Sequence, residues 1–184
     1  MAASPKIVVL SAPSGAGKNT LMDLLRERGV PVAVTVSATT RAPRPGENHG
    51  GHYHFISREE FESLRADNQF YEWAEVHGNL YGTLKSEVER CLASGDHVVL
   101  ELDVQGMRHL RRLHPGVVTV FLMPPSIAEL ERRLRARGAN SEDDIALRLR
   151  NAEVEMAARD EFDFVVVNDE LERAAQELEQ IFRG

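Results

Sequence analysis

The amino-acid sequence predicts an α/β protein whose parallel sheet has helices on both faces, and two observations support this fold class. Segments with helical periodicity alternate with short strand-like runs, as in consecutive βαβ units. The runs are rich in β-branched residues and almost continuously apolar, as strands are when both faces of a parallel sheet are buried. These five predicted strands are 7–11, 32–37, 97–102, 117–123 and 164–168.

Three of the predicted helices show clear spacing or start signals. The segment 19–29 follows the first strand, places its leucines on one face and ends at a glycine. The segments 126–138 and 141–159 each begin at a serine, Ser126 and Ser141, with a carboxylate three positions further on. This serine–carboxylate spacing is typical of a helix N-terminus.

The stretch 38–83 interrupts the alternation of strands and helices. It contains TTRAPRPGENHGGHYHF and GNLYGT, which are rich in proline, glycine and polar residues. A plain loop of this length is uncommon in a compact domain. We therefore expect a small inserted lobe with short strands and one helix over 57–69.

Composition limits the functional classes. The chain has 184 residues and a net charge of −7, which argues against a general nucleic-acid binder. A single cysteine, Cys91, cannot form an internal disulfide or a cysteine-based zinc site. Neither a leader peptide nor a membrane-spanning run is recognisable, so we expect a cytoplasmic protein without a membrane partner. The sequence does not indicate its oligomeric state.

A glycine-rich turn between the first strand and the first helix predicts a phosphate-binding loop. In SGAGKNT, Gly15 and Gly17 let the main chain approach phosphates, and Lys18 reaches the β- and γ-phosphate oxygens. The alternative, an ordinary turn before a helix, is less favoured because the strand and the helix are both present. The predicted ATP-binding loop comprises Ala12, Pro13, Ser14, Gly15, Ala16, Gly17, Lys18, Asn19 and Thr20.

Two positions depart from the motif G-x-x-x-x-G-K-[ST]. Ala12 replaces its first glycine, and Asn19 replaces the hydroxyl that binds Mg²⁺. Thr20 does not substitute for that hydroxyl, because one helical step turns it roughly 100° away. The loop therefore predicts phosphate binding and leaves open whether Asn19 binds Mg²⁺ by its carbonyl, through a water or not at all.

The stretches SATTRAPRPGENHGGHYHF, EWAEVHGNLYGT and ELDVQG together resemble guanylate kinases over about residues 5–182. Some bacterial members share the form SAPSGAGK, with alanine at the first glycine position. The resemblance implies a P-loop nucleoside monophosphate kinase fold, dependence on Mg²⁺ and phosphoryl transfer from ATP to GMP, with dGMP also accepted. It implies one guanylate kinase-like domain over 1–184, with a core (5–37, 84–125 and 158–182), a GMP-binding lobe (38–83) and a lid (126–157).

The resemblance also implies an acceptor site in the lobe. Two arginines three positions apart in a proline-restricted loop can bind a phosphate. A buried glutamate can accept hydrogen bonds from both the N1–H and the 2-amino group of guanine. Without the resemblance, a solvated arginine loop and an exposed Glu72 remain the alternatives. The implied GMP-binding residues are Ser37, Arg41, Arg44, Tyr53, Glu72, Tyr81, Thr83, Asp103 and Arg148.

Two carboxylates, Glu101 and Asp103, follow a predicted strand, where ligand sites of α/β proteins lie. The resemblance implies that they organise Mg²⁺ with Asn19, although the family pair commonly begins with aspartate; a helix cap is the alternative. It further assigns ATP contacts to Arg133, Arg137 and Asn168. The implied catalytic residues are Lys18, Arg41, Arg137 and Arg148.

Two other functions are compatible with parts of this pattern. Guanylate-kinase-like modules of scaffold proteins bind phosphopeptides without catalysis, and Asn19 weakly favours this alternative. Lys18, Asn168 and the three arginines that the resemblance places in the lid argue against it; these are Arg133, Arg137 and Arg148. A kinase for a ribosyl phosphate is the second alternative. It should lack the glutamate that binds guanine and the two tyrosines that bind the phosphate, whereas this chain has Glu72, Tyr53 and Tyr81.

Overall fold

The computed structural model describes residues 5–44, 46–76, 78–136 and 141–184. Its main sheet has five parallel strands in the order β2-β7-β1-β8-β9. They are β1 (Ile7–Ser11), β2 (Val32–Val34), β7 (His97–Glu101), β8 (Val118–Met123) and β9 (Phe164–Val167). The five predicted strands and the α/β fold class are therefore confirmed.

The second strand is shorter than the sequence predicts. It ends at Val34, whereas the apolar run continues to Ser37. The carbonyl of Ser37 accepts a hydrogen bond from the backbone N–H of His54, 2.9 Å away, which belongs to the second sheet. The end of the run therefore leaves the main sheet and leads into the lobe.

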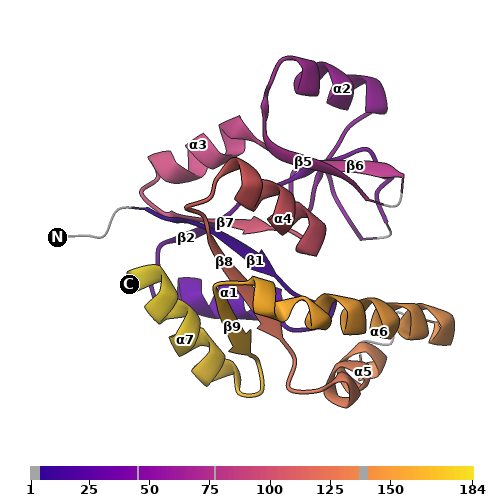
Figure 1. Ribbon diagram of the computed structural model, residues 1–184, viewed down its shortest axis with the longest axis vertical. Helices are drawn as coiled ribbons and strands as arrows, with labels where there is room; N and C mark the ends of the chain where they lie inside the picture. Colours follow the sequence, from indigo (N-terminus) through magenta and orange to yellow (C-terminus); the bar gives the residue numbers. More distant parts are fainter. Residues whose placement is uncertain (1–4, 45, 77, 137–140) are drawn as a thin grey trace.

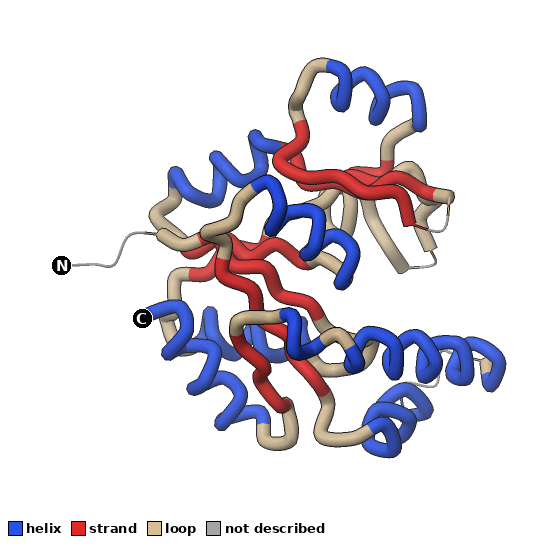
Figure 2. Tube along the Cα trace, in the orientation of Figure 1, coloured by secondary structure: helices blue, strands red, loops and turns tan. Residues whose placement is uncertain are grey.

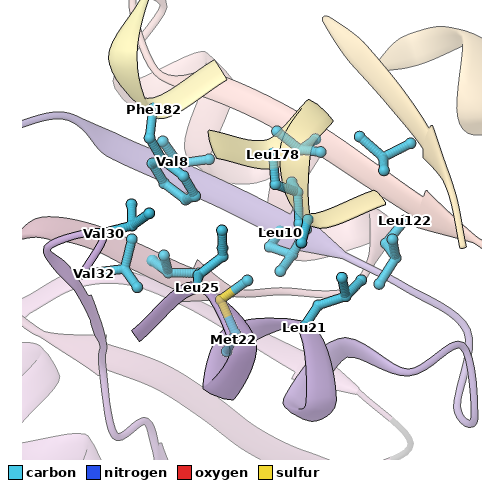
Figure 3. Close-up of a cluster of buried hydrophobic side chains, with 14 of the residues drawn as sticks. Val8, Leu10, Leu21, Met22, Leu25, Val30, Val32, Leu122, Leu178 and Phe182 are labelled. Carbon is cyan, nitrogen blue, oxygen red and sulfur yellow. The ribbon is translucent and has the colours of Figure 1, made fainter. Parts of the chain in front are cut away.

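Helices cover both faces of the main sheet (Figure 1). On one face, α1 (Lys18–Glu27) and α7 (Leu171–Arg183) enclose the apolar cluster shown in Figure 3, which includes Val8, Leu10 and Phe182. On the other face, α3 (Lys85–Ala93) and α4 (Val104–Leu113) pack on a second cluster. A short 3₁₀ turn, Arg159–Glu161, precedes β9. Among the described residues no helix combines the length and apolar character needed to span a membrane.

The inserted stretch forms a separate, smaller sheet (Figure 2). Its strand order is β4-β3-β6-β5. Its strands are β3 (Ala38–Thr39), β4 (His54–Phe55), β5 (Phe70–Val76) and β6 (Asn79–Leu84), and the helix α2 (Arg58–Ala66) packs on them through Phe61. The lobe adjoins the main sheet through α4, where His114 stacks on Tyr71 with 4.3 Å between ring centroids. The predicted single helix within this stretch is confirmed.

The remaining two helices pack together at the other end of the molecule from the lobe (Figure 1). They are α5 (Ile127–Ala136) and α6 (Glu142–Ala157), which share a small apolar cluster. Both predicted starts are confirmed: Ser126 accepts a hydrogen bond from the backbone N–H of Glu129, and Ser141 forms a reciprocal capping box with Asp144. The predicted end of the first of these helices, Gly138, lies outside the described residues.

Candidate active site

The glycine-rich loop joins β1 to α1 at the carboxyl end of the main sheet. Gly15 and Gly17 have φ of +98° and +96°, a region that glycine adopts without steric cost. A Cβ at Gly17 would also lie 2.4 Å from Nδ2 of Asn168. Both glycines are therefore required by the loop geometry. The N-terminus of α1 follows directly, so the positive end of the helix dipole lies at the loop.

Two side chains from distant elements hold this loop in place. The buried amide of Asn168 donates from Nδ2 to the carbonyl of Ala16 at 2.7 Å. Arg133 of α5 donates to the carbonyl of Asn168 at 2.9 Å and lies 3.4 Å from the same Ala16 carbonyl. A hollow of about 370 Å³ is lined by both residues and by Gly15 and Gly17. The contact of Asn168 with a nucleobase stays a prediction, because its amide nitrogen is directed at the loop.

Lys18 is paired with a carboxylate of the neighbouring strand. Its Nζ lies 3.0 Å from Oε2 of Glu101, the last residue of β7. Asp103 caps α4, because its Oδ1 accepts the backbone N–H of Gly106 at 2.7 Å. Asp103 therefore caps a helix, as the alternative predicts, while its contact with GMP or Mg²⁺ stays a prediction. Its second carboxylate oxygen has no hydrogen bond or ion pair with the described residues.

The other predicted donor-side residues lie around the loop. Asn19 is exposed in the first turn of α1, and with Glu101 it lines a polar hollow of about 450 Å³. Arg148 of α6 donates to the hydroxyl of Ser14, so α6 touches the loop. Arg137, the remaining predicted lid arginine, lies outside the described residues.

The acceptor hollow lies between the lobe and the end of the main sheet. It encloses about 160 Å³, and Ser37, Tyr53 and Tyr81 line it from the lobe side. Glu101 and Asp103 line it from the main sheet. The same two carboxylates and Tyr53 line the hollow that contains Lys18. The predicted donor and acceptor sites therefore adjoin each other across one pair of acidic residues.

Glu72 lines the acceptor hollow and is 3% exposed. The hydroxyl of Thr83 donates to its Oε1 at 2.8 Å, and the hydroxyl of Ser37 lies 3.4 Å from that of Thr83. Burial raises the pKa of Glu72 to about 7. A buried carboxylate with one oxygen held by a hydroxyl can accept two parallel N–H donors from a ligand.

Arg41 and the two tyrosines form the rest of the acceptor group. The Arg41 guanidinium lies over the ring of Tyr53, 5.5 Å from its centroid, and the rings of Tyr53 and Tyr81 are 6.1 Å apart. Arg41 forms an ion pair with Glu47 at 2.9 Å. Arg44 is exposed, and its side chain forms no hydrogen bond or ion pair with the described residues.

Sequence reasoning missed two acidic residues at these sites. Glu155 of α6 lines the hollow that contains Lys18 and Asp103. Burial, followed by the nearby Asp103, raises the pKa of Glu155 to about 7, and Lys18 acts in the opposite direction. Glu155 lies in a helix of ordinary charge pattern, so nothing in the sequence marks it. Glu47 follows a Pro-Gly turn, which signals local structure but no particular partner.

Known proteins resemble this chain over nearly its whole length. The family model described as "Guanylate kinase" matches residues 4–184. A guanylate kinase of Rubrobacter xylanophilus is 51% identical over 178 residues, covering 97% of this chain and 93% of its own length. One from Shewanella denitrificans is 48% identical over 182 residues, covering 98% and 88%. The crystal structure of guanylate kinase from Anaplasma phagocytophilum superposes with a TM-score of 0.73 at 34% identity, covering 98% of this chain and 85% of that one.

Proposed function

We propose that this chain, which belongs to the guanylate kinase family and transfers a phosphoryl group from ATP to GMP, holds ATP at the loop 12–20 and GMP in the acceptor hollow. The observation that carries this assignment is the shared wall of the two sites. Tyr53, Glu101 and Asp103 line both the acceptor hollow and the hollow of Lys18. Direct transfer requires the attacking and leaving oxygens to lie roughly in line, so adjoining sites are what this reaction needs.

On the donor side, the main chain does most of the binding. Backbone N–H groups of the loop and the N-terminus of α1 surround the ATP phosphates, and Lys18 neutralises charge on the transferred group. When the nucleotide binds, Lys18 either breaks its ion pair with Glu101 or contacts Glu101 and the phosphates together. Arg148 already touches the loop through Ser14, which places a second cation from α6 beside the phosphates.

On the acceptor side, side chains select GMP. Glu72 in its ionised form accepts the N1–H and the 2-amino group of guanine, and the hydroxyls of Ser37 and Thr83 lie beside it. Adenine lacks that pair of donors and would leave the buried carboxylate unsatisfied. Arg41, Arg44, Tyr53 and Tyr81 hold the phosphate. The proposed contacts involve the base and the phosphate, so dGMP should serve as well.

The residues at the loop fit Mg²⁺ as a nucleotide-bound ion. Asn19, Glu101 and Asp103 offer oxygen atoms, which are the ligands this hard ion takes. No group of three acidic, histidine or cysteine side chains among the described residues could hold a metal ion by itself. ATP oxygens and waters would therefore supply most ligands. When bound, Mg²⁺ neutralises charge on the phosphates during transfer.

The main competing function is phosphopeptide binding without catalysis. The pairing of Lys18 with Glu101 and the support of the loop by Arg133 and Asn168 favour an intact donor site. An assay of ATP consumption coupled to GMP, dGMP, AMP, UMP or CMP tests the proposal. Turnover is expected with GMP and dGMP alone. Binding of GMP without ATP-dependent turnover would favour the phosphopeptide alternative, and turnover with another monophosphate would contradict the role of Glu72.

A further inference from the structure

We propose that Glu47 is a positioning residue that orients Arg41 for the phosphate of GMP, an inference that rests on the proposed acceptor site. The two residues lie in one turn of the lobe between β3 and β4. Glu47 does not need to touch GMP for this role. It acts through the guanidinium that does.

Glu47 makes contacts with both arginines of the phosphate site. Its carboxylate accepts Nη1 of Arg41 at 2.9 Å and Nη2 at 3.0 Å, one on each oxygen. It also accepts the backbone N–H of Arg44 at 2.7 Å. The backbone N–H of Glu47 donates to the carbonyl of Arg44 at 3.0 Å, which closes the turn. One side chain thus fixes a guanidinium and the backbone that carries the second arginine.

These contacts decide which edge of Arg41 remains for a ligand. Nη1 also donates to the carbonyl of Ala42 at 2.7 Å, so three of the five N–H groups are directed at protein acceptors. The two that remain are Nε–H and one N–H of Nη2, which together form the side-on edge of the guanidinium. The rings of Tyr53 and Phe55 lie 5.5 and 5.7 Å from its centre and limit its rotation. The side-on edge is therefore held in one direction. The hydrogen bonds with Glu47 raise the pKa of Arg41, and the neighbouring Tyr81 hydroxyl raises it further.

Charge alone does not explain the presence of Glu47. Its carboxylate cancels one of the two arginine charges at a site that must attract a phosphate dianion. The side chains of Arg41 and Glu47 are only 14% and 17% exposed, so solvent screens the pair weakly. A free arginine side chain loses considerable rotamer entropy when it is fixed on a ligand, and Glu47 removes most of that loss in advance. Glu47 therefore weakens the electrostatic attraction of the site for phosphate, but it improves the orientation of Arg41.

The opposite role would make Glu47 a blocking group that GMP must displace. Two features favour positioning. Glu47 holds the backbone of Arg44, which a displaced blocker would have to release, and it occupies the end-on edge of Arg41 while the side-on edge is left. The two roles predict opposite changes in GMP affinity when the carboxylate is removed.

The test measures the Kd of GMP by calorimetry, and the KM values of GMP and ATP, in Glu47→Ala and Glu47→Gln. With positioning, Glu47→Ala raises the Kd of GMP about tenfold with little change in the KM of ATP. Glu47→Gln shows a smaller rise, because its amide oxygen still accepts one guanidinium N–H. A Kd that falls or stays unchanged in both variants would overturn the inference.

Two controls separate positioning from damage to the lobe. Glu62→Ala removes the carboxylate of another arginine pair of the same lobe, Glu62 with Arg65, and should leave the Kd of GMP unchanged. Guanosine, used as a competitor of GMP, carries the base without the phosphate, and its affinity should be the same in Glu47→Ala and the unmodified protein. An equal loss for guanosine and GMP would overturn the inference. If the unmodified protein did not bind GMP, the proposed function itself would fail.

Discussion

The loop between β1 and α1 and the acceptor lobe both bind phosphate in our proposal, but they are built differently. In the loop, two glycines of positive φ and a helix N-terminus present main-chain N–H groups. In the lobe, arginine, tyrosine and glutamate side chains surround the hollow. Main-chain binding needs few residue types and suits any phosphate, whereas side chains can also distinguish one base from another.

The two regions also differ in how their cations are paired. Lys18 is held by Glu101 from the neighbouring strand, far along the chain, so this pair exists only in the folded sheet. Arg41 is held by Glu47 of its own turn. We infer that the donor site depends on the main sheet, whereas the arginines of the acceptor site, Arg41 and Arg44, are organised by contacts within their own loop. The following predictions test this comparison.

The largest effect is expected from Lys18→Met. Loss of the cation at the transferred phosphate should lower kcat by at least about 10³, while calorimetry still detects GMP binding. Lys85→Met, at the start of α3, is the matched control and should retain turnover. A loss of GMP binding as large as the loss of kcat would show that the two sites are not separate.

Arg41→Met should act on the acceptor side alone. Removing charge-assisted hydrogen bonds to the GMP phosphate should raise the KM of GMP by about 10- to 100-fold and change the KM of ATP little. Arg65→Met, which removes another arginine of the same lobe, should leave both KM values near those of the unmodified protein. Equal increases for the two substrates would contradict the assignment of Arg41.

The raised pKa of Glu72 predicts a pH dependence of GMP binding. Because its pKa is about 7 before GMP binds, Glu72 is mostly protonated at pH 6 and cannot accept both guanine donors. The KM of GMP should therefore fall about tenfold between pH 6 and pH 8. Glu72→Gln, which binds the same phosphate, should lack this step and should discriminate less against AMP. If the KM of GMP changed equally with pH in both proteins, the change would be due to ionisation of the GMP phosphate and not of Glu72.

The smallest effect concerns Asn19. If its carbonyl or a bound water serves Mg²⁺ weakly, Asn19→Ser should lower the Mg²⁺ concentration for half-maximal rate a few-fold, and Asn19→Leu should raise it. GMP affinity, measured by calorimetry, should not change in either variant. If the unmodified protein and both variants required the same Mg²⁺ concentration, the proposed role of Asn19 in binding Mg²⁺ would be contradicted.

Local patterns in the sequence were sufficient for much of the fold and the donor loop. The five buried strands, the helix starts at Ser126 and Ser141, and the turn with Gly15 and Gly17 all depend on residues near one another in the chain. Apolar runs, capping serines and glycine φ angles act over a few residues, so the sequence indicates them directly. The acceptor residues were predicted only from the resemblance to a family. No pattern among neighbouring residues indicates, for example, that the side chain of Glu72 is buried.

Only the tertiary structure decided how distant groups meet. The pairing of β5 with β6 brings Thr83 to the carboxylate of Glu72. Burial raises the pKa of Glu72, and the hydrogen bonds with Thr83 act in the opposite direction. Asn168 reaches the loop because β9 lies beside β8 at the end of the sheet, and α6 carries Glu155 to Lys18 and Asp103. Burial, charge neighbours and hydrogen-bond partners depend on strand order and helix packing, which bring together residues that the sequence separates.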